Sequence, residues 1–301
     1  MIQQLKEEGY EVEAVKNRGY RIVTTPDVIT AEEISSRLHT NWMAENCIYL
    51  ESVDSTNNYA KRIAEDGTPS GTLVVADEQT GGKGRRGRAW CTPKGSAIAM
   101  TIVLRPDIRP ELASMVTLVM GLSVAKAIGS LYPVSVGIKW PNDVVVNGKK
   151  ICGILTEMSA EMTGIHYLVI GTGINTNVEE FPEEIQSVAT SLIKELGEKV
   201  NRAELIAACL KYFEEYYEKY IAAGNLAPLK EDYEALLLNR NNKVRVLEPN
   251  HEYTGLSLGI NEDGELLVEK EDGTVEFSSD ESGTSWSVKD QDGNEETAGA
   301  T

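Results

Sequence analysis

The chain is poor in the residues that build metal centres, disulfide frameworks and nucleophilic catalytic sites. Its 301 residues include four cysteines and three histidines. The cysteines form no Cys-x-x-Cys pair and the histidines are isolated, so neither a zinc site nor a disulfide framework is expected. Gly-x-Ser-x-Gly and His-Glu-x-x-His motifs are also missing. Unpaired cysteines fit a reduced, cytoplasmic compartment.

Long apolar runs and basic residues are scarce as well. The first ten residues carry a charge by residue six and lack the apolar segment of a secretory leader. No stretch approaches the roughly 18 apolar residues of a membrane span, so a soluble protein with no membrane partner is expected. The 29 Lys and Arg against 47 Asp and Glu give a net charge of -18, which disfavours nucleic acid and anionic membranes as partners. Residues 248–296 hold 15 acids and two bases, whereas residues 81–90 hold four bases and no acid. The acidity is therefore concentrated near the C-terminus and leaves one positive island.

Three parts and a tail follow one another along the chain. Residues 1–25 predict a short helix ended by Gly9 and two strands around an Asn-Arg-Gly turn. Pro26 breaks this pattern, and Thr30 with Glu33 has capping-box spacing, which places a boundary near residue 26. Residues 27–239 alternate helical and strand patterns. Short strands between turns predict a small β-barrel over 240–289, and the polar residues 290–301 predict a disordered tail.

The middle part predicts a mixed α and β fold. Its apolar runs predict strands and its periodic segments predict helices: strands at 72–76, 97–104, 136–140 and 167–170, and helices at 57–65, 111–131, 202–223 and about 226–238. The dipeptide Asn147-Gly148 suits a type I′ turn, because both positions of that turn need positive φ. The hairpin that it joins makes the sheet at least partly antiparallel.

The sharpest motif is DEQTGGKGRRGRAW at 77–90, which follows a predicted strand. Its glycines let backbone N–H groups approach a ligand, and Lys83, Arg85, Arg86 and Arg88 supply charge for phosphate or carboxylate oxygens. The motif is neither a Walker A loop nor a dinucleotide fingerprint. The alternative is a flexible, solvated basic loop, but so dense a cluster of cations in an acidic chain favours a binding role.

A second motif, KWPND at 139–143, precedes two lysines just past the hairpin turn. Lys149 is expected at a solvated tip, whereas Lys150 is expected to point into a cleft, because Ile151–Leu155 is too apolar for an exposed edge. Asn142 and Asp143 are either turn residues or ligands of a substrate or Mg²⁺.

Two shorter motifs end or begin elements. DSTN at 54–57 leads into a helix, where capping is the default explanation, although a helix start also directs N–H groups and hydroxyls at a ligand. GTGIN at 171–175 ends a strand and alone predicts only a turn. The cations and backbone N–H groups of these motifs can stabilise anions. This capability suits phosphoryl or adenylyl transfer that proceeds through binding and orientation of the substrates.

Taken in order, DSTN, ADEQTGGKGRRGRAW, KWPND, KKICGIL at 149–155 and GTGIN resemble the biotin protein ligase family. Residues 1–25 look like the end of the recognition helix and the wing of that family's winged-helix repressor domain, so 1–26 is expected to be a truncated or degenerate remnant. The resemblance implies an α+β catalytic domain over 27–239. Its mixed, largely antiparallel sheet with helices would be related to class II aminoacyl-tRNA synthetases, and an SH3-like β-barrel would follow over 240–289.

The resemblance also implies an activity. Biotin and MgATP would give biotinyl-5′-AMP and pyrophosphate, and a lysine of a biotin carboxyl carrier protein would then accept the biotin. The alternatives are a biotin-responsive transcriptional repressor and a lipoate-type or other acyl-adenylate ligase. Residues 1–25 carry four bases and four acids, which offers no net footprint for DNA. The identity of the carrier and a homodimer through the edge of the central sheet stay open.

Residue roles follow from the resemblance, motif by motif. The residues implied to bind biotin are Ser55, Thr56, Asn57, Gln79, Lys83, Gly84, Arg85, Lys150, Gly153, Leu155, Gly171 and Gly173. Those implied to bind ATP are Arg85, Arg88, Trp90 near adenine, Lys139, Asn142, Asp143 and Asn175. Lys150 and Arg85 are implied to be catalytic, with Lys150 neutralising charge between the biotin carboxylate and the α-phosphate. Mg²⁺ would enter with ATP, and no protein ligand is assigned to it.

Two departures from the family pattern are expected to matter. Lys83 stands where an arginine is usual, and because lysine lacks the bidentate fork, weaker retention of the adenylate is expected. The segment 282–289 matches the family's ending only loosely, with Lys289 where an arginine is usual. The resemblance therefore supports an ATP contact from the C-terminal domain less strongly than it supports the contacts of the other motifs.

Overall fold

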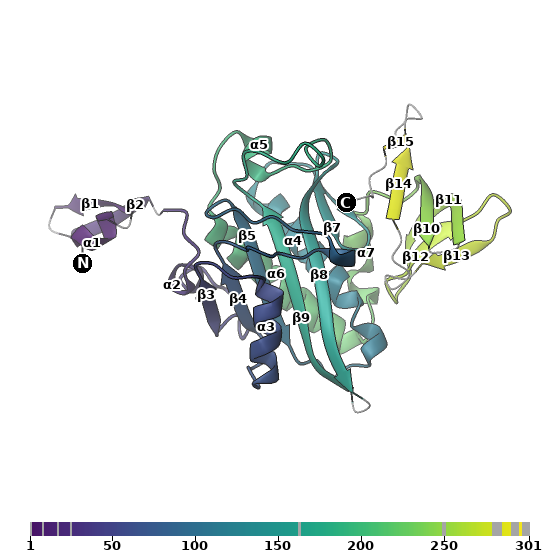
Figure 1. Ribbon diagram of the computed structural model, residues 1–301, viewed down its shortest axis with the longest axis horizontal. Coiled ribbons are helices and arrows are strands. Elements are labelled where there is room, and N and C mark those ends of the chain that lie inside the picture. The colour runs from purple at the N-terminus through teal and green to yellow at the C-terminus, as the bar shows by residue number, and fades with distance from the viewer. Residues whose placement is uncertain are drawn as a thin grey trace.

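Three separate sheets follow one another along the longest axis of the computed structural model (Figure 1). The structure describes residues 2–7, 9–16, 18–24, 26–161, 164–248, 251–278, 285–289 and 295–296. The N-terminal part stands apart at one end, and the C-terminal sheet lies at the other. The central part between them carries the largest sheet and most of the buried apolar residues.

The N-terminal part is a helix followed by a hairpin, as the sequence predicts. It consists of α1 (Ile2–Glu7), β1 (Glu11–Val15) and β2 (Gly19–Thr24), with β1 and β2 antiparallel. The next helix, α2 (Ala31–Ser35), starts at the predicted cap, since Thr30 Oγ1 accepts a hydrogen bond from Glu33 N at 3.3 Å.

The central sheet has seven strands in the order β3-β4-β5-β9-β8-β7-β6. Their bounds are β3 (Cys47–Leu50), β4 (Thr72–Ala76), β5 (Ala97–Leu104), β6 (Val136–Lys139), β7 (Asp143–Val146), β8 (Lys149–Glu161) and β9 (Gly164–Asn175). Among the pairs of neighbouring strands in this sheet, β3 with β4 is parallel and the others are antiparallel. The turn between β7 and β8 has φ of 50° at Asn147 and 79° at Gly148, as a type I′ turn requires. The prediction of an α+β fold with a mixed sheet is confirmed.

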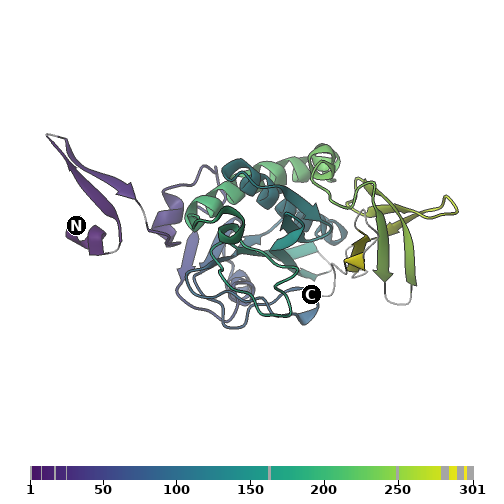
Figure 2. The same ribbon diagram turned by 90° about the horizontal axis from the view of Figure 1, so that it is seen from above.

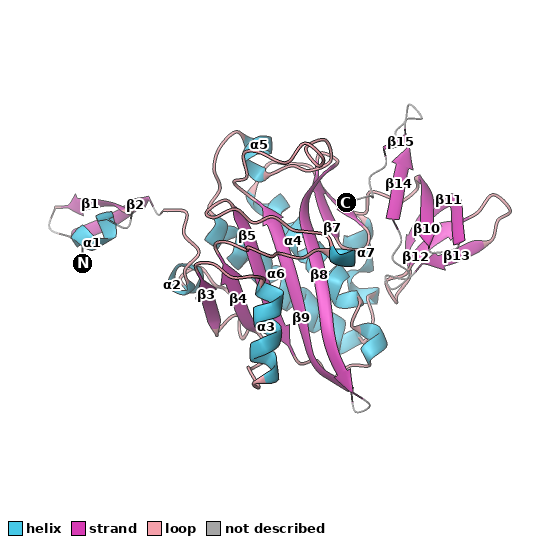
Figure 3. Ribbon diagram, viewed as in Figure 1, coloured by secondary structure: helices cyan, strands magenta, loops and turns pink. Residues whose placement is uncertain are grey.

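Helices cover the two faces of this sheet unequally (Figures 2 and 3). The long helices α4 (Met115–Leu131) and α6 (Arg202–Ala223) pack together on one face and bury the main core. The shorter α3 (Thr56–Glu65) lies on the other face, where Ala60 and Ala64 pack on Val103 and Val169. Because α3 covers only part of its face, the remainder of the sheet can form the floor of a cavity.

The expectation that no stretch resembles a membrane span was too strict. The helical segment Pro110–Leu131, which comprises η2 (Pro110–Leu112) and α4, is long and apolar enough to cross a membrane. In the structure 78% of its most apolar window is buried inside the protein. A helix that is apolar all round is typical of a core helix enclosed on every side, which is the position of α4 between the sheet and α6.

The predicted helix at 226–238 is wrong beyond its first turns. The structure has η3 (Ala227–Leu229) and α7 (Lys230–Glu234), and the chain then runs alongside β6. Ile138 N donates to Leu236 O at 2.7 Å, and Leu238 N donates to Ile138 O at 3.0 Å. Pairing with the open edge of β6 has therefore replaced the last helical turn. Another short helix, α5 (Leu192–Leu196), was not predicted.

The C-terminal sheet has the strand order β13-β12-β11-β10-β14-β15. Its strands are β10 (Lys243–Glu248), β11 (His251–Ile260), β12 (Leu266–Glu269), β13 (Val275–Ser278), β14 (Ser285–Lys289) and β15 (Glu295–Glu296). It is anchored to the central domain by Trp140, which is 1% exposed and donates from Nε1 to Gly264 O at 2.9 Å. The tail expected at 290–301 contributes β15, and its other residues lie outside the described ones, as do 281–284.

Candidate active site

One cavity collects every residue that the resemblance implies to bind biotin or ATP. The side chain of Arg86 lies outside the described parts. The volume of the cavity is about 230 Å³. It lies on the face of the sheet that carries α3, over the part that α3 leaves uncovered. Its walls come from the start of α3, the basic loop, the KWPND turn, β8 and β9. These segments are far apart in the sequence, so the five motifs form a single site. The role of each residue stays a prediction, because its position alone does not test it.

The cavity floor is made of small residues on β5, β8 and β9, among them Ala99, Gly153 and Gly173. A Cβ added at Gly171 would lie 2.1 Å from Asn57 Oδ1, and one added at Gly173 would lie 2.3 Å from Trp90 Nε1. Both distances are far below van der Waals contact. The glycines of GTGIN therefore let two side chains lie directly on the sheet, a function that the sequence alone did not distinguish from a turn.

The start of α3 presents buried polar groups to the cavity. Ser55 occupies the N-cap position but makes no capping hydrogen bond through its side chain, so the default explanation of DSTN fails for this residue. The cap comes instead from Gln79, whose Oε1 accepts from Thr56 N at 2.9 Å and from Thr56 Oγ1 at 3.0 Å. Gln79 thus holds the helix start and the basic loop in one fixed arrangement.

The basic loop is folded into a small hairpin. Gly84 N donates to Arg88 O at 2.7 Å and Trp90 N donates to Gly82 O at 2.9 Å, with Arg85–Gly87 forming a 3₁₀ turn (η1) at the tip. A Cβ at Gly82 would lie 2.3 Å from Trp90 O, so glycine is required for this close approach of two backbones. The binding alternative is favoured over a solvated loop, because Arg85 and Arg88 line the cavity.

A cluster of cations surrounds the carboxylate of Asp143 beside this hairpin. Lys150 Nζ lies 2.8 Å from Asp143 Oδ1 and 5.8 Å from the centre of the Trp90 ring. Burial lowers the pKa of Lys139, and the positive charge of Lys150 acts in the same direction against the opposing effect of Asp143. Lys150 lines the cavity whereas Lys149 is exposed, as expected. Two lysines beside one carboxylate leave net positive charge for an anionic ligand, and Arg88 adds to it near Lys139.

Arg85 joins the basic hairpin to the KWPND turn, since its Nη1 donates to Asn142 Oδ1 at 3.2 Å. Asn142 Nδ2 donates in turn to Ile154 O at 3.1 Å. The orientation of the Asn142 amide is therefore set from both sides. The hairpin and the turn form one wall, on which the cations of both motifs are brought together.

Two further parts of the site were missed by the sequence reasoning. Residues 178–189 line the cavity and anchor the strand that carries Lys150, because Lys150 N donates to Val188 O at 2.8 Å and Thr190 N donates to Lys150 O at 2.9 Å. This segment has no motif or periodicity that separates it from an ordinary loop. Its place beside Lys150 depends on the folded chain.

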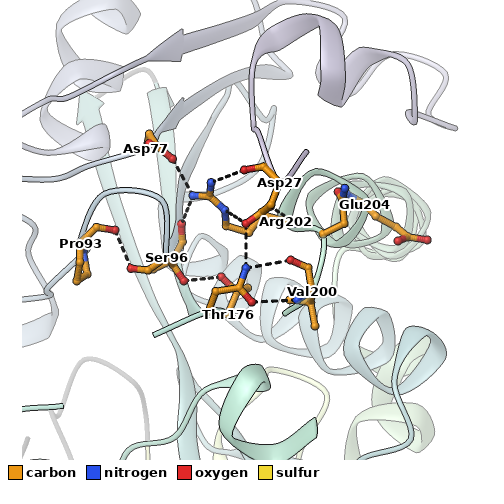
Figure 4. A network of polar contacts seen from close by, with 11 residues as sticks. Asp27, Asp77, Pro93, Ser96, Thr176, Val200, Arg202 and Glu204 are labelled. Carbon is orange, nitrogen blue, oxygen red and sulfur yellow. Dashed lines mark hydrogen bonds and ion pairs between the residues drawn. The ribbon is translucent and has the colours of Figure 1, made fainter. Parts of the chain in front are cut away.

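The second missed part is a buried arginine behind the site (Figure 4). Arg202 is 2% exposed, and its guanidinium donates to Asp27 Oδ2 at 2.9 Å, to Asp77 Oδ1 at 2.8 Å and to Ala97 O at 3.2 Å. Asp27 also accepts from Asn177 Nδ2 at 2.9 Å. Asp77, Ala97 and Asn177 each precede a segment that lines the cavity. Arg202 and Asp27 therefore fix the positions from which these three segments extend.

A divalent cation has few protein ligands available here. Among the described residues, no three His, Cys, Asp or Glu side chains gather into a metal-binding group. The cavity offers the Asp143 carboxylate and the Asn142 amide oxygen, a small oxygen donor set of the kind that holds Mg²⁺ when phosphates and water supply the other ligands. The residues present therefore fit a metal that arrives with a nucleotide.

Comparison with known proteins agrees with this geometry. Residues 49–175 match the model of the biotin/lipoate A/B protein ligase family, and residues 241–280 match that of the biotin protein ligase C-terminal domain. A protein from Bacillus subtilis named bifunctional ligase/repressor BirA is 40% identical over 274 residues, which are 90% of this chain and 84% of that protein. The chain belongs to the biotin protein ligase family.

Other members of the biotin protein ligase family extend the match. The biotin–[acetyl-CoA-carboxylase] ligase of Mycobacterium tuberculosis is 32% identical over 222 residues, covering 71% of this chain and 80% of that protein. The structure of biotin protein ligase from Aquifex aeolicus in complex with biotin and ATP superposes with a TM-score of 0.69 at 33% identity. It covers 77% of this chain and 95% of that one.

Proposed function

We propose that this chain is an ATP-dependent biotin protein ligase, which forms biotinyl-5′-AMP from biotin and MgATP and transfers the biotin to a lysine of a biotin carboxyl carrier protein. The observation that carries the proposal is the single cavity in which the cations of the basic hairpin face those of KWPND and Lys150. The relatives that the chain matches include named biotin–[acetyl-CoA-carboxylase] ligases.

In the first step, a biotin carboxylate oxygen attacks the α-phosphorus of ATP and pyrophosphate leaves. Two anions must approach each other, so the chief task of the protein is to neutralise and orient them. Lys150 and Arg85 serve this role, with Lys139 and Arg88 on the same wall. Mg²⁺ bound with ATP would supply further neutralisation of the phosphates, and we propose Asp143 and Asn142 as the residues that would hold it.

The polar groups at the start of α3 would take the other end of biotin. Ser55, Thr56 and Asn57 are buried, and Gln79 reaches them from the basic loop. A polar ring in this corner would lie against the Asn57 side chain that covers Gly171, with the valeryl arm and carboxylate directed along the floor toward Lys150. Gly153, Leu155 and Gly173 shape this path, while Lys83 and Gly84 close over the carboxylate. Trp90 and Asn175 are left for the nucleotide.

In the second step, the amine of the carrier lysine attacks the biotinyl carbonyl, the bond to the phosphate oxygen breaks, and AMP leaves. The amine loses its proton in this step, and the product is an amide. The enzyme forms no covalent intermediate in this scheme.

The test is incubation of the full chain with biotin, MgATP and a biotin carboxyl carrier domain, read by streptavidin blot. Biotinylated carrier is expected, and none should form without ATP or with a carrier whose acceptor lysine is replaced by arginine. The acyl-adenylate alternative is tested by offering lipoate or another carboxylic acid in place of biotin and measuring pyrophosphate release. We expect release with biotin and not with the other acids. Release with lipoate but not with biotin would overturn the proposal.

A second function as a biotin-responsive repressor is favoured by one observation only, the name bifunctional ligase/repressor carried by several relatives. A gel-shift with a biotin operator tests it. Salt-sensitive, sequence-specific binding would support the repressor function, and we expect none from this chain.

Finer features of the fold belong to the same proposal. The mixed, largely antiparallel sheet backed by α4 and α6 supports a catalytic domain over 27–239 related to class II aminoacyl-tRNA synthetases. The six-stranded sheet supports an SH3-like domain over 240–289. Residues 1–26 would belong to a winged-helix domain. The cysteine pattern supports a cytoplasmic location. A homodimer through the sheet edge would use β3, because residues 236–238 already pair with β6 at the other edge. Sedimentation of the full chain measures whether a dimer forms.

A further inference from the structure

A fully buried hydroxyl lies directly behind the polar corner of the cavity. Thr101, on β5, is 0% exposed, and its Oγ1 lies 2.7 Å from Asn57 Oδ1 and 2.9 Å from Thr56 Oγ1. Asn57 and Thr56 line the cavity, but Thr101 is not among the lining residues. Its hydroxyl therefore connects two groups of the cavity wall without being placed to touch a ligand.

The direction of each hydrogen bond follows from the partners of Asn57. Asn57 Nδ2 donates to Glu157 Oε2 at 2.8 Å and to Leu155 O at 3.2 Å, which uses both of its N–H groups. Asn57 Oδ1 therefore faces Thr101. Since an amide oxygen only accepts, the Thr101 hydroxyl must be the donor in this contact.

Thr101 has one hydroxyl hydrogen, which goes to Asn57, so toward Thr56 its oxygen can only accept. Thr56 also has one hydroxyl hydrogen, which is shared between two acceptors, Thr101 Oγ1 and Gln79 Oε1. The Thr56 hydroxyl also lies near Gln79 Oε1, whose orientation is fixed because Oε1 accepts from Thr56 N and Nε2 donates to Thr92 Oγ1 at 3.1 Å. A continuous chain of polar contacts thus runs from Glu157 through Asn57, Thr101 and Thr56 to Gln79.

We propose that Thr101 is a positioning residue for biotin binding, acting through the side chains of Asn57 and Thr56. The inference rests on the proposed function. Without the Thr101 hydroxyl, Asn57 Oδ1 loses its donor and the Thr56 hydroxyl loses an acceptor, while both remain buried. Each side chain can then turn away from the orientation that a polar ring requires. Lys139 and Arg88, on the cavity wall proposed to bind the nucleotide, take no part in this series of hydrogen bonds.

A matched control exists on the opposite face of the sheet. Thr117, on α4, is 3% exposed, and its Oγ1 lies 2.8 Å from Thr156 Oγ1 on β8. Like Thr101 it is a buried threonine that is bonded to a second threonine hydroxyl and does not line the cavity, but its partner Thr156 does not line the cavity either, whereas Thr56 and Asn57 do. Thr117→Val therefore removes a similar hydrogen bond in a similar environment, away from the site.

The experiment compares Thr101→Val, Thr101→Ser and Thr117→Val in the full chain. Pyrophosphate release gives kcat and the KM values for biotin and for ATP, and thermal unfolding gives stability. Thr101→Val should raise the KM for biotin by about tenfold, the factor expected when a buried acceptor loses its donor, and leave the KM for ATP within about twofold. Thr101→Ser keeps the hydroxyl and should restore biotin binding. Thr117→Val should lower stability without changing the KM for biotin.

An unchanged KM for biotin in Thr101→Val, or equal impairment in Thr101→Ser, would overturn the proposal. If Thr101→Val does not fold, Thr101→Ala takes its place beside Thr101→Ser, with the same expected contrast. Calorimetric titration with biotin alone separates this inference from the proposed function. A wild-type chain that binds biotin but releases no pyrophosphate contradicts the ligase and still allows the Thr101 comparison by affinity. A wild-type chain that binds no biotin contradicts both.

Discussion

Arg202 donates from Nη1 to Asp77 Oδ1 at 2.8 Å across 125 residues of sequence, and the pair lies behind the cavity. Asp77 is the first residue after β4 and lies two residues before Gln79, which caps α3. The same guanidinium holds Asp27 in the segment that leads from the N-terminal hairpin. One buried cation thus ties the entry of the central domain to the start of the ligand-binding loop.

Arg202→Met should destabilise the protein strongly. The substitution leaves the Asp27 and Asp77 carboxylates largely buried without their cation, and breaking such a pair costs about 3–5 kcal/mol. Urea unfolding at pH 7 measures the free-energy change. Arg21→Ala is the control, because the Arg21 and Glu13 side chains are 67% and 61% exposed and such a surface pair contributes only about 0–1 kcal/mol. Equal losses in the two variants would contradict the assignment.

Lys150→Ala should slow adenylate synthesis by about 100-fold, because removing one preorganised group that stabilises developing charge typically costs about 100–1,000-fold in kcat. The measurement is the initial rate of pyrophosphate release with biotin and MgATP. Lys149→Ala is the control, since this neighbouring lysine is exposed at the hairpin turn and should keep the wild-type rate. Wild-type turnover in Lys150→Ala would remove Lys150 from the catalytic residues.

Arg85→Ala should mainly shorten the lifetime of the bound adenylate. Losing charge-assisted hydrogen bonds to an anion costs about 1.5–3 kcal/mol, which is about 10–100-fold in the dissociation rate. Chasing preformed biotinyl-5′-AMP with excess unlabelled biotin and ATP measures that rate. Arg240→Ala, an exposed arginine paired with Glu234 outside the cavity, should leave it unchanged. A variant that retains the adenylate normally but makes it slowly would exchange the roles given to Arg85 and Lys150.

Local patterns predicted much of the fold because they depend on few residues. The bounds of β4, β5 and α6 agree with the sequence prediction, since uninterrupted apolar runs and a helical period determine them. The inward position of Lys150 followed from the apolar strand beside it. The segment after α7 departed from its helical period because the open edge of β6 offers it backbone partners, which no local pattern records.

Contacts between distant segments could not be predicted in this way. Arg202 lies inside the helical period of α6 and looks like any exposed arginine, while its partner Asp27 is 175 residues away. Thr101 sits in an apolar strand and resembles a residue chosen for β-propensity. The contacts of both side chains can be recognised only when α6, β4, β5 and α3 are brought together in the folded structure.

Gly171→Ala should weaken biotin binding more than it weakens the fold. The added Cβ would lie 2.1 Å from Asn57 Oδ1, so the Asn57 side chain must leave its place between Thr101 and Glu157. Forcing extra volume into a packed site costs about 1–3 kcal/mol, and we expect a rise in the KM for biotin of about 5–100-fold. Gly121→Ala is the matched control, because its Cβ would lie 3.7 Å from Ile154 Cδ1, and alanine in a helix is favoured by about 1 kcal/mol. A normal KM for biotin in Gly171→Ala would show that the position of Asn57 over the glycine does not matter for binding.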